Sequence, residues 1–209
     1  MEALIFGIIV LILSVIIHEV AHGYAAYALG DPTAKLAGRL TLNPVPHIDL
    51  VGSIILPGLM VLSNSGVLFG WAKPVPYNPY NLKNQRWGEA IVGAAGVATN
   101  LLIAVVFGLI TRYAYTHGYD VFAGLAAIVT LTNLSLGLFN LIPIPPLDGY
   151  TILRGLLPYR LSLSFRALEE RMQAAGFLTL IILLFAFSYF FSGPFSEFIA
   201  YIFRLLVGV

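Results

Sequence analysis

The chain has 209 residues, of which 59% are apolar and only 10% are charged, and its formal net charge is +1. Soluble globular domains carry about 25% charged residues, so this composition excludes an ordinary soluble protein and indicates a helical integral membrane protein. The near-zero net charge argues against a nucleic-acid partner, and the lack of cysteine excludes disulfides, thiolate metal ligands and a thiol nucleophile.

Long apolar runs predict an all-α polytopic membrane protein that forms one membrane-embedded domain over residues 1–209. About 20 apolar residues are needed to cross a bilayer as a helix. We therefore expect five to six membrane segments in the lipid bilayer, with full spans at about 4–29, 89–112, 120–141, 174–191 and 195–208.

The segment between the first two full spans, residues 48–71, is apolar but interrupted. Pro57-Gly58 and the polar run 63–66 divide it into pieces too short to cross a bilayer as one helix. This pattern is compatible with a broken crossing or with a re-entrant element. The proline-rich stretch 73–80 that follows predicts an extended loop at the membrane interface.

Three ionisable residues, His18, Glu19 and His22, interrupt the first apolar span. Ionisable side chains are costly inside a bilayer and are functional by default. Two histidines four residues apart project from one face of a helix and can bind one metal ion, with Glu19 near enough to reach a metal-bound water. The motif predicts a zinc peptidase site within the membrane, and a polar helix-packing cluster is the alternative.

A catalytic zinc site has three protein ligands and a water, so a third ligand must come from elsewhere in the chain. The candidates in or beside the membrane segments are His47, Asp49, Glu89, His117, Asp120, Asp148 and Glu197. Asp148 stands out because three prolines between residues 143 and 146 break the helix before it. Non-helical backbone at membrane depth is tolerated only where it is buried or lines a cavity. Capping of the following helix is the alternative role for this aspartate.

Two separate motifs of the chain have the residue types and spacing of a known family. The first is His-Glu-Val-Ala-His at 18–22, and the second is Asn-Leu-Ile-Pro-Ile-Pro-Pro-Leu-Asp-Gly at 140–149. Together they resemble the site-2 protease family of intramembrane zinc metalloproteases. The family signature pairs HExxH with N-x-x-P-x-x-x-L-D-G. The chain is similar to the minimal prokaryotic subgroup in which HExxH comes first.

The resemblance implies that His18, His22 and Asp148 bind one Zn²⁺ ion and that Glu19 is the catalytic base. Under ordinary zinc chemistry, Glu19 takes a proton from the metal-activated water and later delivers it to the leaving amine. The substrates that the resemblance implies are single-span transmembrane proteins or remnant signal peptides.

Two asparagines complete the expected catalytic set. Asn140 matches the asparagine of the second family motif, which is suggested to hold substrate or the oxyanion. Asn100 matches the asparagine of a G-P-x-x-N motif in the family's middle span, although Val97 stands in place of the proline. We expect both side chains to donate to the oxyanion, and interhelical hydrogen bonds are their alternative role.

The ligands must lie at one depth, which requires the first span and the 120–141 span to run parallel. The segment 48–71 must then enter and leave on the same side. Under this arrangement most of the basic residues face one compartment, namely Lys35, Arg39, Lys73, Lys83, Arg86, Arg154, Arg160, Arg166 and Arg171. The positive-inside rule then predicts a prokaryotic cytoplasmic-membrane protein with its N-terminus outside and its active site nearer the cytoplasmic face.

Two other functions compete with proteolysis. A metal-ion transporter would carry histidines and acids at several depths, whereas the spans beyond the motif offer only asparagine and serine. A non-catalytic membrane scaffold would be expected to lose the glutamate or a ligand, and none is missing. His47 and Asp49 are more typical of residues that satisfy loop backbone than of ligands.

Overall fold

The structure is a computed structural model that describes residues 2–55, 58–59, 62, 71–174 and 176–208. Within these residues the long elements are helices and no strand is present. The α-helices are α1 (Glu2–Ala28), α2 (Thr33–Leu36), α4 (Gly88–Thr116), α5 (Asp120–Asn140), α6 (Asp148–Leu156), α7 (Tyr159–Ala174) and α8 (Phe177–Val207). Three shorter helical turns are η1 (Val45–His47), η2 (Leu50–Ile55) and η3 (Pro79–Asn81). The predicted all-α fold class is confirmed.

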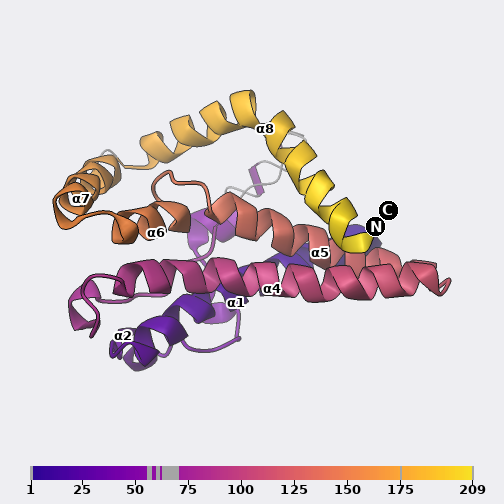
Figure 1. Ribbon diagram of the computed structural model, residues 1–209, viewed down its shortest axis with the longest axis horizontal. Helices are drawn as coiled ribbons and strands as arrows, with labels where there is room; N and C mark the ends of the chain where they lie inside the picture. The colour runs from indigo at the N-terminus through magenta and orange to yellow at the C-terminus, as the bar shows by residue number, and fades with distance from the viewer. Residues whose placement is uncertain (1, 56–57, 60–61, 63–70, 175, 209) are drawn as a thin grey trace.

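Four described helical stretches are long and apolar enough to cross a membrane: Glu2–Ala28, Gly88–Thr116, Asp120–Asn140 and Tyr189–Val207. The first three coincide with predicted spans. The last belongs to α8, a single helix that joins the two segments expected at 174–191 and 195–208. Pro194 lies inside α8 without ending it, and the helix bends as Figure 1 shows. Proline is tolerated within membrane helices more readily than in soluble ones.

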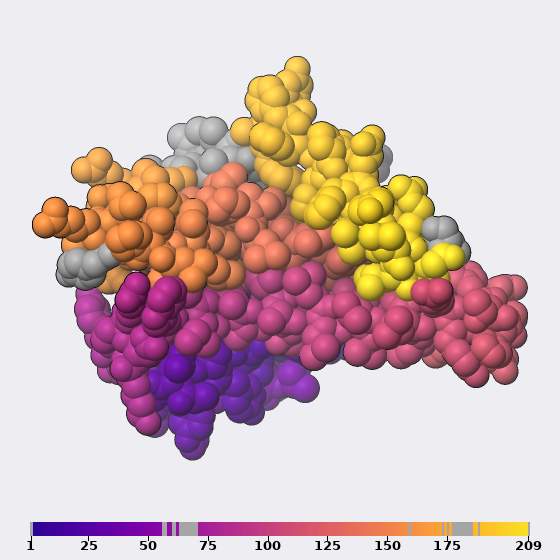
Figure 2. Space-filling model, viewed as in Figure 1, coloured from indigo at the N-terminus to yellow at the C-terminus, as the bar shows by residue number. Residues whose placement is uncertain are grey.

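The bundle that holds the site consists of α1, α4 and α5. In Figure 1, α1 and α5 run in the same direction and α4 runs against both, which is the parallel relation predicted from the two motifs. Small residues let these helices approach closely. At Gly137 of α5, for example, a Cβ would lie 2.8 Å from Leu101 Cδ2 of α4. Figure 2 shows the C-terminal half of α8 lying against both α4 and α5.

An ion cluster, made of Glu89, Arg154, Arg166 and Glu169, ties α6 and α7 to the N-terminal end of α4. Arg154 lies at its centre and is 5% exposed. Its Nη2 lies 2.9 Å from Glu89 Oε1 and its Nη1 lies 2.6 Å from Glu169 Oε2. Arg166 Nη2 lies 2.8 Å from Glu89 Oε2. The cluster thus links three helices through charged hydrogen bonds.

Asp31 closes the turn after α1 and is fully buried. Its Oδ1 accepts hydrogen bonds from the Thr33 hydroxyl at 2.6 Å and from Asn81 Nδ2 at 2.8 Å, and its Oδ2 accepts from the Asn78 N–H at 2.6 Å. Burial alone would raise the pKa of this carboxyl. The hydrogen bonds from Thr33, Asn81 and Asn78 outweigh burial and lower the pKa below its usual value. Asp31 therefore anchors the 78–81 turn to the end of α1.

The predicted re-entrant segment 48–71 is described only in part. Its first portion forms η2, while residues 56–57, 60–61 and 63–70 lie outside the described residues, so the re-entrant path stays a prediction. After it, the chain returns toward α1 as residues 71–78, which contain no helix. The Trp71 N–H donates to the Gly52 carbonyl at 3.1 Å, and the Lys73 N–H donates to the His47 carbonyl at 2.8 Å.

Candidate metal centre

Three side chains that can hold a metal ion meet where α1 faces the start of α6. They are His18, His22 and Asp148, whose ligand atoms all lie within 4.8 Å of one another. His18 Nε2 lies 3.0 Å from His22 Nε2. Asp148 Oδ2 lies 2.9 Å from His18 Nε2, and its Oδ1 lies 3.3 Å from His22 Nε2. The structure thus brings together the three residues expected to be ligands.

These distances fit a zinc ion. A tetrahedral zinc with bonds of roughly 2.0–2.2 Å separates its ligand atoms by about 3.4 Å, close to the spacings observed here. Asp148 Oδ2 is buried and accepts no hydrogen bond within the described part of the chain. A carboxylate and two imidazole lone pairs that converge away from water are costly unless a cation lies between them. The donor set and its burial therefore suit one zinc ion.

Gly96 of α4 makes room for both imidazoles. A Cβ at this position would lie 2.5 Å from His22 Cε1 and Nε2 and 2.8 Å from His18 Cε1. Real Cβ contacts are essentially never this short, so the rings lie directly against the helix backbone. The glycine of the Gly-Val-Ala-Thr-Asn stretch is thus required by the site rather than by helix packing alone.

The outer nitrogen of each imidazole is also bonded to α4. His18 Nδ1 lies 2.5 Å from Asn100 Oδ1, and His22 Nδ1 lies 2.7 Å from the Val92 carbonyl oxygen. Both partners are acceptors in these contacts, so each Nδ1 donates its proton. Each Nε2 then keeps its lone pair for the metal. The structure therefore holds both histidines in the tautomer that a metal ligand needs.

Asp148 is the first residue of α6, and no side-chain hydrogen bond caps this helix. Its carboxylate faces the histidines instead of capping the helix, which was the alternative role. Gly149 follows because a Cβ there would overlap the Leu141 carbonyl oxygen. Gly93 of α4 lets α6 approach, since a Cβ there would lie 3.4 Å from the Asp148 carbonyl oxygen. The Leu-Asp-Gly sequence is thus explained by close backbone packing beside a ligand.

Glu19 is held by the 71–78 segment. Its Oε2 accepts a hydrogen bond of 2.8 Å from the Val75 N–H. The same segment packs on the next turn of α1, because a Cβ at Gly23 would lie 2.9 Å from Val75 Cγ1. The carboxylate next to the first ligand is therefore fixed by a backbone donor.

The two asparagines expected to be oxyanion donors differ in their burial and in their hydrogen-bond partners. Asn100 is fully buried, and its Nδ2 donates to Asn133 Oδ1 at 2.8 Å and to the Ser14 carbonyl at 3.4 Å. With both N–H groups engaged, Asn100 is arranged to orient His18. Asn140 is partly exposed and donates an N–H to the Leu136 carbonyl at 3.0 Å.

Three of the remaining candidate ligands, His47, Asp49 and Glu89, serve other roles. His47 is buried, with its Nε2 at 2.9 Å from the Thr41 carbonyl oxygen. Asp49 Oδ1 accepts the N–H of Gly52 at 2.7 Å, so both residues satisfy loop backbone as the alternative anticipated. Glu89 belongs to the ion cluster.

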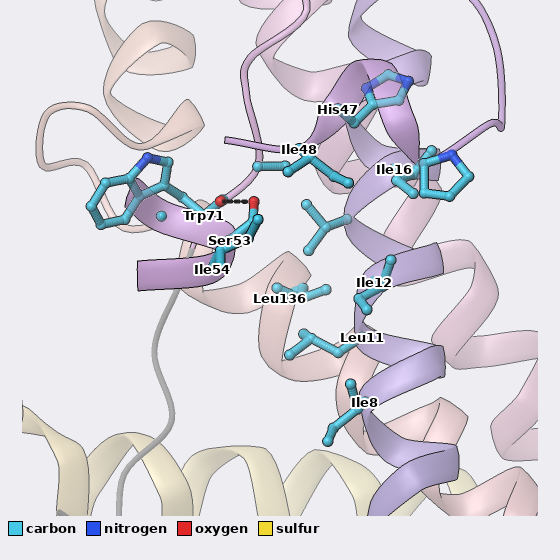
Figure 3. Close-up of a pocket in the computed structure, with 14 residues that line it drawn as sticks. Ile8, Leu11, Ile12, Ile16, His47, Ile48, Ser53, Ile54, Trp71 and Leu136 are labelled. Carbon is cyan, nitrogen blue, oxygen red and sulfur yellow. Dashed lines mark hydrogen bonds between the residues drawn. The ribbon is translucent and has the colours of Figure 1, made fainter. Parts of the chain in front are cut away.

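A cavity of about 340 Å³ lies along α1 on the N-terminal side of the ligands. Figure 3 shows its apolar lining: Ile8, Leu11, Ile12 and Ile16 come from α1, Leu136 comes from α5, and Ile48, Ile54 and Trp71 face them. The α1 portion ends at Ile16, within the helical turn before His18. An apolar cavity therefore adjoins the candidate metal centre.

Three groups that contribute to the site were not predicted from the sequence to belong to it: Ser14, Asn133 and the Val75 N–H. Ser14 lies four residues before His18 on α1, so helical periodicity places it on the same face. Asn133 shares a face of α5 with Asn140, two turns away. Val75 contributes through its backbone, for which the residue type carries no signal.

The chain is similar to one family profile and to several related proteins. A profile described as Peptidase family M50 matches residues 114–187, which include Asp148. The chain is 39% identical to the protein named “Putative zinc metalloprotease YwhC” of Bacillus subtilis, with 84% of this chain and 78% of the relative aligned. It is 31% identical to “Putative zinc metalloprotease Rip2” of Mycolicibacterium smegmatis, over 83% of this chain and 64% of the relative. The “Zinc metalloprotease MJ0392” of Methanocaldococcus jannaschii is 28% identical, over 85% of this chain and 41% of the relative. No solved structure matches significantly.

Proposed function

This chain belongs to peptidase family M50, and on that premise we propose that it is a zinc endopeptidase that cleaves peptide bonds within transmembrane segments of other proteins. The observation that carries the proposal is the convergence of His18, His22 and Asp148 between helices apolar enough to lie in a membrane. The Bacillus subtilis relative named “Putative zinc metalloprotease YwhC” aligns over most of both chains.

His18 and His22 would hold the zinc ion through Nε2, and Asp148 would hold it through its carboxylate. When bound, zinc lowers the pKa of a coordinated water toward neutrality and polarises the scissile carbonyl. Glu19 accepts the proton of the attacking water and delivers it to the leaving amine. The Val75 N–H keeps the Glu19 carboxylate in place, at 2.8 Å from Oε2. Asn140 offers its second N–H to the substrate.

The substrate is an apolar, membrane-inserted segment, such as that of a single-span protein or a remnant signal peptide. The apolar cavity beside His18, lined by Ile8, Ile12 and Leu136 among others, suits such a chain better than a polar peptide (Figure 3). The segment must unwind near the metal, because helical amides are shielded from attack.

The protein lies in a prokaryotic cytoplasmic membrane with its N-terminus outside and its active site nearer the cytoplasmic face. The supporting observation is the distribution of basic residues. Arg154 and Arg166 lie at the end of the bundle near the ligands, whereas Arg112 lies at the other end beside Gly208. An excess of lysine and arginine marks the cytoplasmic side.

The test is cleavage of a single-span substrate by the purified full chain in detergent and in vesicles, with zinc content measured on the same samples. We expect cleavage that stops with a zinc chelator and returns on addition of zinc. Glu19→Gln should retain its zinc and lose about 10²–10⁴-fold in rate. Asp148→Ala should lose zinc as well as activity.

Three outcomes would contradict the proposal. Cleavage by Glu19→Gln at the wild-type rate would remove Glu19 as the base, and full zinc occupancy in Asp148→Ala would remove that residue from the metal. Zinc transport into vesicles by a wild type that leaves the substrate intact would instead favour a transporter.

A further inference from the structure

A buried chain of hydrogen bonds, which we call the amide cluster, leads away from the metal centre through Ser14, His18, Asn100 and Asn133. It crosses α1, α4 and α5. Asn100 and Asn133 are fully buried and Ser14 is 4% exposed. Asn100 Nδ2 donates to Asn133 Oδ1 at 2.8 Å, and Asn133 Nδ2 donates to Ser14 Oγ at 2.9 Å and to the Val129 carbonyl at 3.0 Å. The proposed reaction uses none of these bonds beyond the one to His18.

The polarity of this cluster is set by a backbone carbonyl, which can only accept. The amide of Asn133 presents an N–H to the Val129 carbonyl and therefore turns its Oδ1 toward Asn100. That oxygen in turn requires an N–H from Asn100, so Asn100 turns its own Oδ1 toward His18. Each amide thus passes its orientation to the next group.

The consequence falls on the tautomer of His18. An acceptor at its Nδ1 keeps the proton there and leaves the Nε2 lone pair facing Asp148 and His22. A reversed Asn100 would present an N–H to Nδ1, and His18 would then carry its proton on Nε2, where it blocks the metal. The Ser14 carbonyl, which accepts from Asn100 Nδ2 at 3.4 Å, favours the same orientation through a longer and weaker hydrogen bond than the one to Asn133.

We propose that Asn133 is a positioning residue of the metal centre: through Asn100 it fixes the tautomer in which His18 presents Nε2 to zinc. The inference rests on the proposed zinc site and adds a residue that touches neither metal nor substrate. Ser14 takes part by accepting from Asn133 through its hydroxyl and from Asn100 through its carbonyl.

The test compares zinc affinity with apoprotein stability in Asn133 variants of the full chain. Asn133→Leu removes the acceptor for Asn100 at similar volume, and we expect the Kd for zinc to rise about 10–100-fold, as for other partners of metal-bound histidines. Asn133→Asp, neutral when buried among helices, can still accept from Asn100 and donate to Val129, so it should bind zinc within threefold of wild type. Asn133→Ser carries the same test if the leucine variant does not fold, because its short side chain cannot reach Asn100.

Thr130→Val is the matched control. Thr130 is fully buried on α5 one turn from Asn133, and its hydroxyl lies 3.5 Å from that of Thr111 on α4 without contacting the amide cluster. We expect this variant to change the melting temperature of the apoprotein but leave the zinc Kd unaltered.

Zinc Kd is measured by competition with a chromophoric chelator, and the melting temperature is measured on the metal-free protein. Unchanged zinc Kd in Asn133→Leu or Asn133→Ser, with wild-type zinc binding and cleavage intact, would overturn this inference alone. Failure of Asn133→Asp to restore affinity would also overturn it. A wild type that binds no zinc would instead overturn the proposed function.

Discussion

The two polar clusters that flank the metal centre along α4 are built from different chemistry. The ion cluster around Arg154 gathers four charged side chains at the start of α4. The amide cluster around Asn100 is neutral, and it lies roughly 16 Å further along the helix, on the far side of Gly96.

Under the proposed placement in the membrane, this difference follows from the depth of each cluster. A buried ion costs several kcal/mol in desolvation, more in hydrocarbon, whereas a neutral amide costs far less once its hydrogen bonds are made. The ion cluster holds α6, which begins with Asp148, at the end of the bundle where α7 leaves it. The amide cluster orients His18 within the span. Each ligand-bearing helix is thus fixed by the chemistry that its depth allows.

The largest expected effect comes from breaking the ion cluster at its centre. Arg154→Met leaves the carboxylates of Glu89 and Glu169 without this partner in a largely buried site, which should cost about 3–5 kcal/mol in the free energy of unfolding. Unfolding in mixed detergent micelles measures it. Adding Glu169→Gln to Arg154→Met should recover part of the loss, because it removes the Glu169 carboxylate while Glu89 keeps its ion pair with Arg166. A loss below about 1 kcal/mol in Arg154→Met would show that the cluster is not structural.

A smaller effect is expected between the clusters, at Gly96. Gly96→Ala introduces a Cβ 2.5 Å from the His22 ring, so the imidazoles must move and the zinc Kd should rise at least tenfold, about 1.4 kcal/mol. Gly108→Ala is the control on the same helix, because its Cβ would lie 3.1 Å from Leu206 Cβ and away from the site. Equal zinc affinity in the two variants would contradict the proposed contact between Gly96 and the rings.

The smallest effect concerns Asp31, where a charge is stabilised entirely by hydrogen bonds. In Asp31→Asn the side-chain NH2 group would face the Asn78 N–H, so two donors would meet where an acceptor now lies. We expect the free energy of unfolding to fall by about 1–2 kcal/mol at neutral pH. Because the pKa of Asp31 is lowered by folding, its contribution is present above the unfolded value of about 4 and is lost as the pH falls through the folded value. The stability difference between wild type and Asp31→Asn should therefore shrink below about pH 4, as measured by thermal unfolding. A stability difference between wild type and Asp31→Asn that grows as the pH falls would contradict a lowered pKa of Asp31.

The extent of prediction from sequence differs among the site residues. His18, Glu19 and His22 follow from helical periodicity in an apolar run, and Asp148 follows from the proline-broken second motif. The orientation of the Asn100 amide cannot be predicted in this way, because its partner Asn133 lies on another helix. The hydrogen bond between Asn133 and Ser14, which completes the cluster, joins residues 119 positions apart in the sequence. The sequence predicts that these residues lie on helices, but it does not predict that their side chains face one another.

The fold shows the same division. Hydropathy predicts spans at about 4–29, 89–112 and 120–141, and the structure has helices over 2–28, 88–116 and 120–140. Long apolar runs in a bilayer have few alternatives to helix. Hydropathy does not decide whether Pro194 ends a helix or bends one. That outcome depends on neighbours that can satisfy the freed carbonyl, and the structure keeps α8 continuous.

The most direct test of the central claim is X-ray absorption at the zinc edge, combined with metal content, on the purified wild type. We predict one zinc per chain with nitrogen and oxygen ligands only, at about 2.0–2.2 Å, and outer-shell scattering from two imidazoles. His18→Ala should lose one imidazole or the metal. A site with three or more imidazoles, or a folded wild type that binds no zinc, would contradict the assignment of His18, His22 and Asp148.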